Sequence, residues 1–118
     1  PFSASRAPQL RLALATAQLA VEGAGLAEPA LQNLKAALLV ENDDPFTWYQ
    51  TAQAYSTLKN EAMANLATAE LWYNVGDMRR AIVFATRARG KLPQGGTDWQ
   101  RANDILGAAA SQAQQQRG

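Results

Sequence analysis

The stretch Trp48-Tyr49-Gln50-Thr51-Ala52-Gln53-Ala54-Tyr55 decides the fold of this 118-residue chain. Trp48, Ala52 and Tyr55 recur at the spacing of one helix face, and a small residue, Ala64, follows nine positions later. Aromatic side chains at helical spacing are usually core residues, and they need small residues opposite them. The expected core aromatics are Trp48, Tyr55, Trp72 and Phe84, with Ala52, Ala64, Ala69 and Ala81 opposite them.

Helix-forming residues dominate the rest of the chain as well. Alanine is the commonest residue, and β-branched residues never alternate over the length of a strand. We therefore predict an all-α domain. Six helices are expected at about 8–22, 29–41, 45–58, 61–74, 78–90 and 98–112. Residues 1–7 are expected to be a linker, 8–112 the domain and 113–118 a frayed tail.

Local start and stop residues set these boundaries. Asp44-Pro45 is an N-cap followed by proline at the first helical position. Asn60 is expected to cap the fourth helix, and Gly76-Asp77 to end that helix and cap the next. Thr97 or Asp98 is the expected cap of the last helix.

The spacing W-x2-T-A-x2-Y resembles the signature of the tetratricopeptide repeat. The resemblance implies three helix hairpins stacked in an α-solenoid that presents a docking groove. A second match, from Ala69-x2-Trp72 through Gly76-Asp77 to Pro93, lies half a repeat out of step. The first register is favoured and puts the first, third and fifth helices on the inner face. The second register stays open and would put the even-numbered helices there.

Under the favoured register, groove-facing positions fall on the third and fifth helices. Tyr49 is the expected apolar anchor, and Arg80 and Arg87 are the expected donors to carboxylates. The predicted partner is therefore a protein or peptide segment that bears acidic groups. The alternative, which requires no binding function, is that the arginines form a solvated helix face. The candidate groove residues are Phe46, Tyr49, Gln53, Ser56 and Thr57 on the third helix, with Arg80, Val83, Arg87 and Lys91 on the fifth.

Composition argues against catalysis by these residues. The chain has no Cys and no His, so thiolate zinc sites, a Cys nucleophile and an imidazole base are excluded. No catalytic, cofactor-binding or metal-binding residue is predicted, and a chain acting alone as an enzyme is not expected. No run of 18 uncharged apolar residues occurs, so no transmembrane segment is expected.

The small net charge of +1 is divided unevenly along the chain. Residues 1–72 hold four basic and seven acidic residues, about −3, whereas residues 73–118 hold seven basic and three acidic residues, about +4. This asymmetry favours an acidic partner for the second half. Nucleic acid is not an expected partner, because phosphate tracking needs a larger basic surface.

The closing segment carries a narrower resemblance. Leu92-Pro93 and the run Asp98-Trp99-Gln100-Arg101-Ala102-Asn103-Asp104 are similar to the end of the C-terminal tetratricopeptide region of bacterial zinc metallopeptidases of the prenyl-protease-like, β-barrel assembly-enhancing type. The resemblance implies an upstream domain with a zinc-binding H-E-x-x-H motif, in a periplasmic or envelope protein of quality control. No catalytic role transfers to this chain, which we expect to be a piece of a longer protein. Its implied partners are its own protease domain, substrates and outer-membrane assembly components.

Two other interpretations stay open. The chain could be a tetratricopeptide adaptor of an unrelated multidomain protein, or a self-assembly module that uses helix faces left open at the ends of the stack. An upstream H-E-x-x-H motif would separate the metallopeptidase interpretation from the adaptor.

Overall fold

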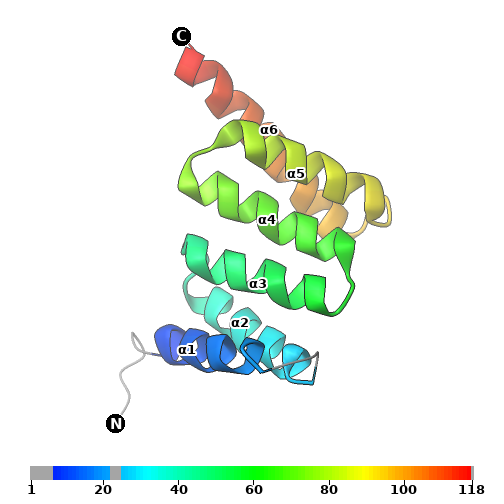
Figure 1. The fold of residues 1–118 in the computed structure, drawn as a ribbon. Helices are drawn as coiled ribbons and strands as arrows, with labels where there is room; N and C mark the ends of the chain where they lie inside the picture. Colours follow the sequence, from blue (N-terminus) through cyan, green and yellow to red (C-terminus); the bar gives the residue numbers. More distant parts are fainter. Residues whose placement is uncertain (1–6, 22–24, 118) are drawn as a thin grey trace.

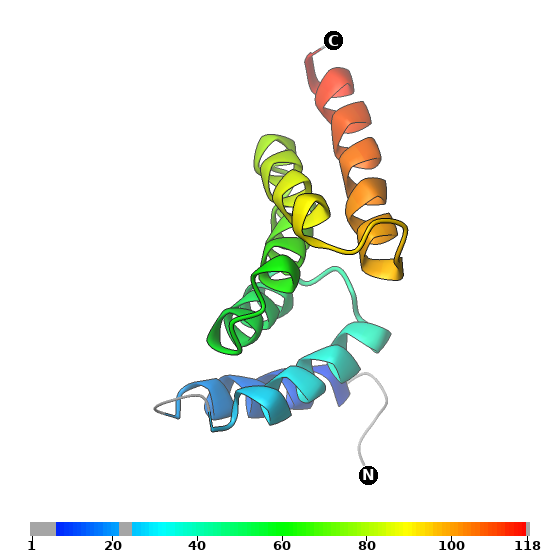
Figure 2. The same ribbon diagram turned by 90° about the vertical axis from the view of Figure 1, so that its right-hand side faces the viewer.

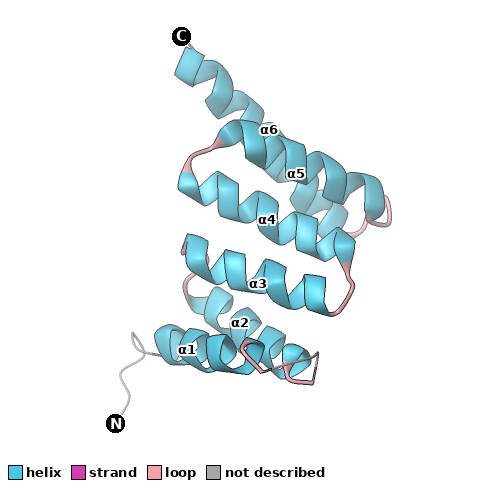
Figure 3. Ribbon diagram, viewed as in Figure 1, coloured by secondary structure: helices cyan, strands magenta, loops and turns pink. Residues whose placement is uncertain are grey.

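The computed structural model describes residues 7–21 and 25–117, which form six α-helices and no strand (Figures 1 and 3). The predicted all-α, repeat-like fold is confirmed. Consecutive helices run antiparallel and short loops join them, as in a stack of helix hairpins (Figure 1). None of these helices is long and apolar enough to cross a bilayer. The helices are α1 (Ala7–Leu19), α2 (Ala27–Val40), α3 (Pro45–Thr57), α4 (Glu61–Val75), α5 (Met78–Lys91) and α6 (Thr97–Arg117).

The middle helices begin at the predicted caps. The Asp44 carboxylate accepts a hydrogen bond from the Phe46 N–H at 3.4 Å, and Pro45 is the first residue of α3. Asn60 accepts from the Met63 N–H at the start of α4, and Asp77 accepts from the Arg80 N–H at the start of α5. Gly76 ends α4 with a φ of 98°, the left-handed conformation that glycine adopts without a Cβ clash.

The outer helices depart from the predicted boundaries. α1 ends at Leu19 rather than near residue 22, and α2 begins at Ala27, after a residue with no side-chain cap. α6 already includes Thr97, so Thr97 and Asp98 belong to its first turn. Residues 1–6 of the expected linker at 1–7 lie outside the described residues, as do Gly23, Ala24 and Gly118. Ala7, the last residue of that expected linker, is instead the first residue of α1.

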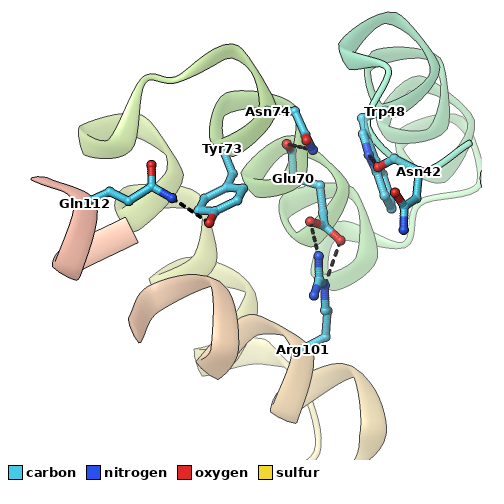
Figure 4. Close-up of polar contacts among 7 residues, drawn as sticks. All are labelled: Asn42, Trp48, Glu70, Tyr73, Asn74, Arg101 and Gln112. Atoms are coloured by element: carbon cyan, nitrogen blue, oxygen red, sulfur yellow. Dashed lines mark hydrogen bonds and ion pairs between the residues drawn. The ribbon is translucent and has the colours of Figure 1, made fainter. Parts of the chain in front are cut away.

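The end of α6 is helical through residues that were predicted to fray. The amide of Gln112 donates a hydrogen bond of 2.8 Å to the hydroxyl of Tyr73 on α4 (Figure 4). Ala113 packs against the buried core of α4, α5 and α6. These contacts tie α6 to α4 and favour continuation of the helix to Arg117.

The six helices form two units of three. α1, α2 and α3 contact one another, as do α4, α5 and α6. The contact of α3 with α4, which joins the units, is more extensive than that of α3 with α2. Each unit has its own core. The N-terminal core, which also takes Ala67 from α4, contains Ala15, Ala30, Leu31, Leu34, Ala54 and Tyr55. The C-terminal core contains Leu66, Ala69, Met78, Ala81, Ala85, Ala88, Ala102, Ile105 and Ala109.

This division corrects the favoured repeat register. α1 does touch α3, but in the described residues no Cα atom of α3 lies within 8 Å of a Cα atom of α5, because α4 lies between these helices in one layer (Figure 1). α4 instead touches α6, which is the neighbour relation of the half-shifted register. Each register therefore describes one unit, and α1, α3 and α5 do not form a continuous inner row.

The core aromatics are less buried than predicted. Tyr55 is buried, with 8% of its surface exposed, whereas Trp48, Trp72 and Phe84 are only partly buried. The indole N–H of Trp48 donates to the carbonyl oxygen of Asn42 at 2.8 Å, which holds that ring at the edge of α3 (Figure 4). Partial exposure leaves these rings available to the surface hollows described next.

Candidate docking surfaces

Three predicted groove residues line one cavity. Tyr49, Gln53 and Ser56 project from α3 into a cavity of about 400 Å³ that α4 and α5 complete. The residues opposite them are Thr68, Leu71 and Trp72 of α4 and Phe84 of α5. The cavity is mainly apolar, with a few polar side chains in its lining, which is the usual make-up of a binding hollow.

The two predicted arginines stand over the aromatic rings of this cavity. The guanidinium carbon of Arg80 lies 4.6 Å from the ring centroid of Trp72, and that of Arg87 lies 5.0 Å from the centroid of Phe84. Such cation–π contacts contribute roughly 0.5–1 kcal/mol at exposed sites. They orient both charges beside the cavity, and we call the surface formed by Tyr49, Gln53, Trp72, Arg80, Phe84 and Arg87 the basic–aromatic face.

Both arginines are available to bind a carboxylate of a ligand. Arg80 has an ion pair with Asp77 at 3.7 Å, but that pair is long and exposed, so it contributes little. Arg87 has no ion pair among residues 7–21 and 25–117. A carboxylate that approaches the face meets two donors that hold no strong partner.

The remaining predicted groove residues lie outside this cavity. Phe46 stacks on Tyr49, with ring centroids 6.3 Å apart, and is about half exposed. Thr57 lines a neighbouring cavity of about 300 Å³ between α1 and α3, which shares Tyr49 and Gln53 with the first. Val83 and Lys91 are exposed on α5, where Lys91 approaches Glu61 at 3.5 Å. Of the predicted set, Tyr49, Gln53, Ser56 and Thr57 line these two hollows, whereas Phe46, Val83 and Lys91 line neither.

A second surface was not predicted. An apolar cavity of about 450 Å³ opens between the two three-helix units, and we call it the interunit cleft. Trp48 and Tyr55 of α3 and Met63 and Leu66 of α4 line it. Residues of α2 and of the first turn of α6 complete the lining, and Figure 2 shows the end of α2 close to the start of α6. The half-shifted repeat match was the sequence feature that pointed to this side, because it put the even-numbered helices inside.

An ion pair with a buried carboxylate forms part of one wall of the interunit cleft. The carboxylate of Glu70 on α4 is buried and accepts two hydrogen bonds from the Arg101 guanidinium, at 2.6 and 2.8 Å (Figure 4). These bonds raise the pKa of Arg101 above its ordinary value, and burial of the group opposes that effect. The pair joins α6 to α4, and it satisfies a charge that would otherwise be costly to bury.

Tyr55 and Lys35 form the polar part of the opposite wall. Burial raises the pKa of the Tyr55 hydroxyl above its ordinary value, and the charge of Lys35 partly offsets this rise. The ammonium of Lys35 lies 5.9 Å from the centroid of the Tyr55 ring. The phenol therefore stays neutral at physiological pH and acts as a hydrogen-bonding, largely apolar wall.

The described residues contain no cluster of three His, Cys, Asp or Glu side chains that could hold a metal ion. Comparison with known proteins adds no assignment, because no family model and no curated protein matches the chain. The site chemistry therefore has to be inferred from the two surfaces themselves.

Proposed function

We propose that the chain is a non-catalytic protein-docking domain whose basic–aromatic face binds an extended or helical segment bearing acidic groups. The observation that carries this proposal is the cavity of about 400 Å³ flanked by Arg80 and Arg87, both held over aromatic rings. An apolar side chain of the ligand fills the cavity, and its carboxylates bind the two guanidinium groups. Tyr49 is the aromatic anchor beside them.

We further propose that the domain serves a zinc metallopeptidase of the cell envelope. Support comes from the resemblance of the closing segment, residues 98–104, to the end of that family's repeat region. The zinc and the peptidase chemistry would belong to the parent's protease domain, and the docked segments to its substrates or to outer-membrane assembly partners. Sequencing the coding region upstream tests this context: an H-E-x-x-H motif supports it, and a different upstream domain favours the adaptor.

Calorimetric titration with two synthetic peptides tests the docking proposal directly. The probe is a ten-residue peptide of alternating Glu and Leu, and the matched peptide has Lys in place of every Glu. We expect the acidic peptide to bind in a salt-dependent manner and the basic peptide not to bind. Binding of the two peptides with equal affinity would contradict the proposal.

Charge reversal on α5 identifies the surface. The double variant Arg80→Glu, Arg87→Glu should weaken binding of the acidic peptide by at least about tenfold. Its folding should be preserved, because Glu at position 80 lies in the first turn of α5, where a negative charge favours the helix. The control is Arg79→Glu, Arg117→Glu, which makes the same change of charge around a separate hollow at the end of α6. Equal loss of binding in both variants would mean a diffuse charge effect rather than a docking face.

A further inference from the structure

The most exposed large apolar side chain of the described residues belongs to the interunit cleft. Leu39, which belongs to the cleft wall, is 89% exposed, and its neighbour Val40 is 66% exposed. Both stand at the last turn of α2. An apolar projection of this size beside an apolar hollow is typical of an interaction surface rather than of a solvated one.

The charges of the cleft balance one another. Lys35 comes from α2 and Asp98 from the first turn of α6, which lie on opposite sides of the cleft (Figure 2). Glu70 and Arg101 already neutralise each other. The cleft therefore offers one charge of each sign, unlike the basic–aromatic face, and does not select for an acidic segment.

The interunit cleft thus combines a projecting apolar side chain, Leu39, with an apolar hollow and with two opposite charges, on Lys35 and Asp98. In a two-fold symmetric pair, if a residue i of one copy contacts a residue j of the second copy, then residue j of the first copy contacts residue i of the second. A surface that carries both partners of each contact is therefore complementary to itself. We propose that two copies of this chain pair through the interunit cleft. Leu39 of each copy enters the cleft of the other, and Lys35 faces the second copy's Asp98.

This pairing goes beyond the proposed docking function and uses a different surface. The interunit cleft lies among α2, α3, α4 and α6, whereas the basic–aromatic face is formed by α3, α4 and α5. A paired molecule would present two basic–aromatic faces, so a partner with two acidic segments would bind with increased avidity.

Sedimentation equilibrium of the full chain tests the pairing. The wild-type chain should have twice its 12.7 kDa mass at high concentration. Leu39→Asp should weaken pairing by at least about tenfold, because it places a charge in an apolar contact. The control is Leu14→Asp, which changes a leucine of α1 that is 49% exposed and lies outside the cleft. This variant should pair like the wild type.

Exchange of the charges at Lys35 and Asp98 provides a second test of the pairing. Lys35→Asp and Asp98→Lys should each weaken pairing, because each brings like charges together across the two-fold axis, and the double variant should restore it. The variant Arg80→Glu, Arg87→Glu should pair normally, so failure of docking and failure of pairing are distinguishable. A monomeric wild type, pairing unaffected by Leu39→Asp, or loss of pairing in Leu14→Asp alone would overturn the proposal.

Discussion

Glu70 illustrates how one buried charge organises the C-terminal unit. Only 3% of its surface is exposed, and its two carboxylate oxygens both bind Arg101, which follows 31 positions later. The segment at residues 98–104 thus has structural contacts: Arg101 binds Glu70, and Asn103 accepts a hydrogen bond from Arg89 at 2.9 Å. The sequence pattern contained the segment but nothing that linked Arg101 to Glu70, because that contact depends on how α6 packs.

Removal of Arg101 should therefore destabilise the fold. We expect Arg101→Ala to lower the free energy of unfolding by roughly 1–3 kcal/mol, less than for a fully buried pair, because the Arg101 side chain is 52% exposed. Arg101→Lys keeps the charge but loses the two-pronged geometry, and should cost less. Urea denaturation measures both variants. Unchanged stability of Arg101→Ala would show that water satisfies Glu70 equally well.

At the scale of elements, local chemistry predicted most of the fold. Asp44-Pro45, Asn60 and Gly76-Asp77 act within a few residues of the chain, so their effect on α3, α4 and α5 was readable without the tertiary structure. The start of α2 was placed too late, because Leu26 provides no side-chain cap. The end of α6 was placed too early, because its support comes from Tyr73 on another helix.

A matched pair of glycine substitutions tests this reading of the helix ends. Gly76→Ala should lower the free energy of unfolding by roughly 1–2 kcal/mol, because alanine disfavours a φ of 98°. Gly107→Ala should raise it by roughly 0.5–1 kcal/mol, because this residue lies within α6 and a Cβ there meets nothing within 4 Å. Thermal unfolding of the two variants should shift in opposite directions. A shift in the same direction would contradict the assignment of Gly76 as a left-handed cap.

At the scale of the whole molecule, the repeat pattern in the sequence did not predict the arrangement of the helices in two units. Both repeat matches were present, but choosing between them required knowing that α4 separates α3 from α5 and touches α6. The prediction of the docking surface depended on that choice. The predicted residues Tyr49, Gln53, Ser56, Arg80 and Arg87 do lie in one region of the structure, but the interunit cleft was not predicted.

Two cores imply two regions that can open separately. Leu34 is fully buried in the N-terminal core and Ile105 is buried in the C-terminal core. Leu34→Ala and Ile105→Ala should each cost about 3 kcal/mol. In native-state hydrogen exchange, Leu34→Ala should accelerate α1, α2 and α3 most, and Ile105→Ala should accelerate α4, α5 and α6 most. Uniform acceleration of all six helices by either variant would show a single cooperative unit.

Docking at the basic–aromatic face can be tested by NMR, from the backbone and side-chain chemical shifts recorded while the acidic Glu–Leu peptide is added. Trp72 and Phe84 belong to the cavity of the basic–aromatic face, and Trp48 belongs to the interunit cleft, so the indole signals of the two tryptophans report on different surfaces. We expect saturable shifts at Tyr49, Gln53 and the Trp72 indole, with the Trp48 indole unchanged. Shifts confined to Trp48 and its neighbours in the cleft, or no saturable shift at any residue of the basic–aromatic face, would contradict it.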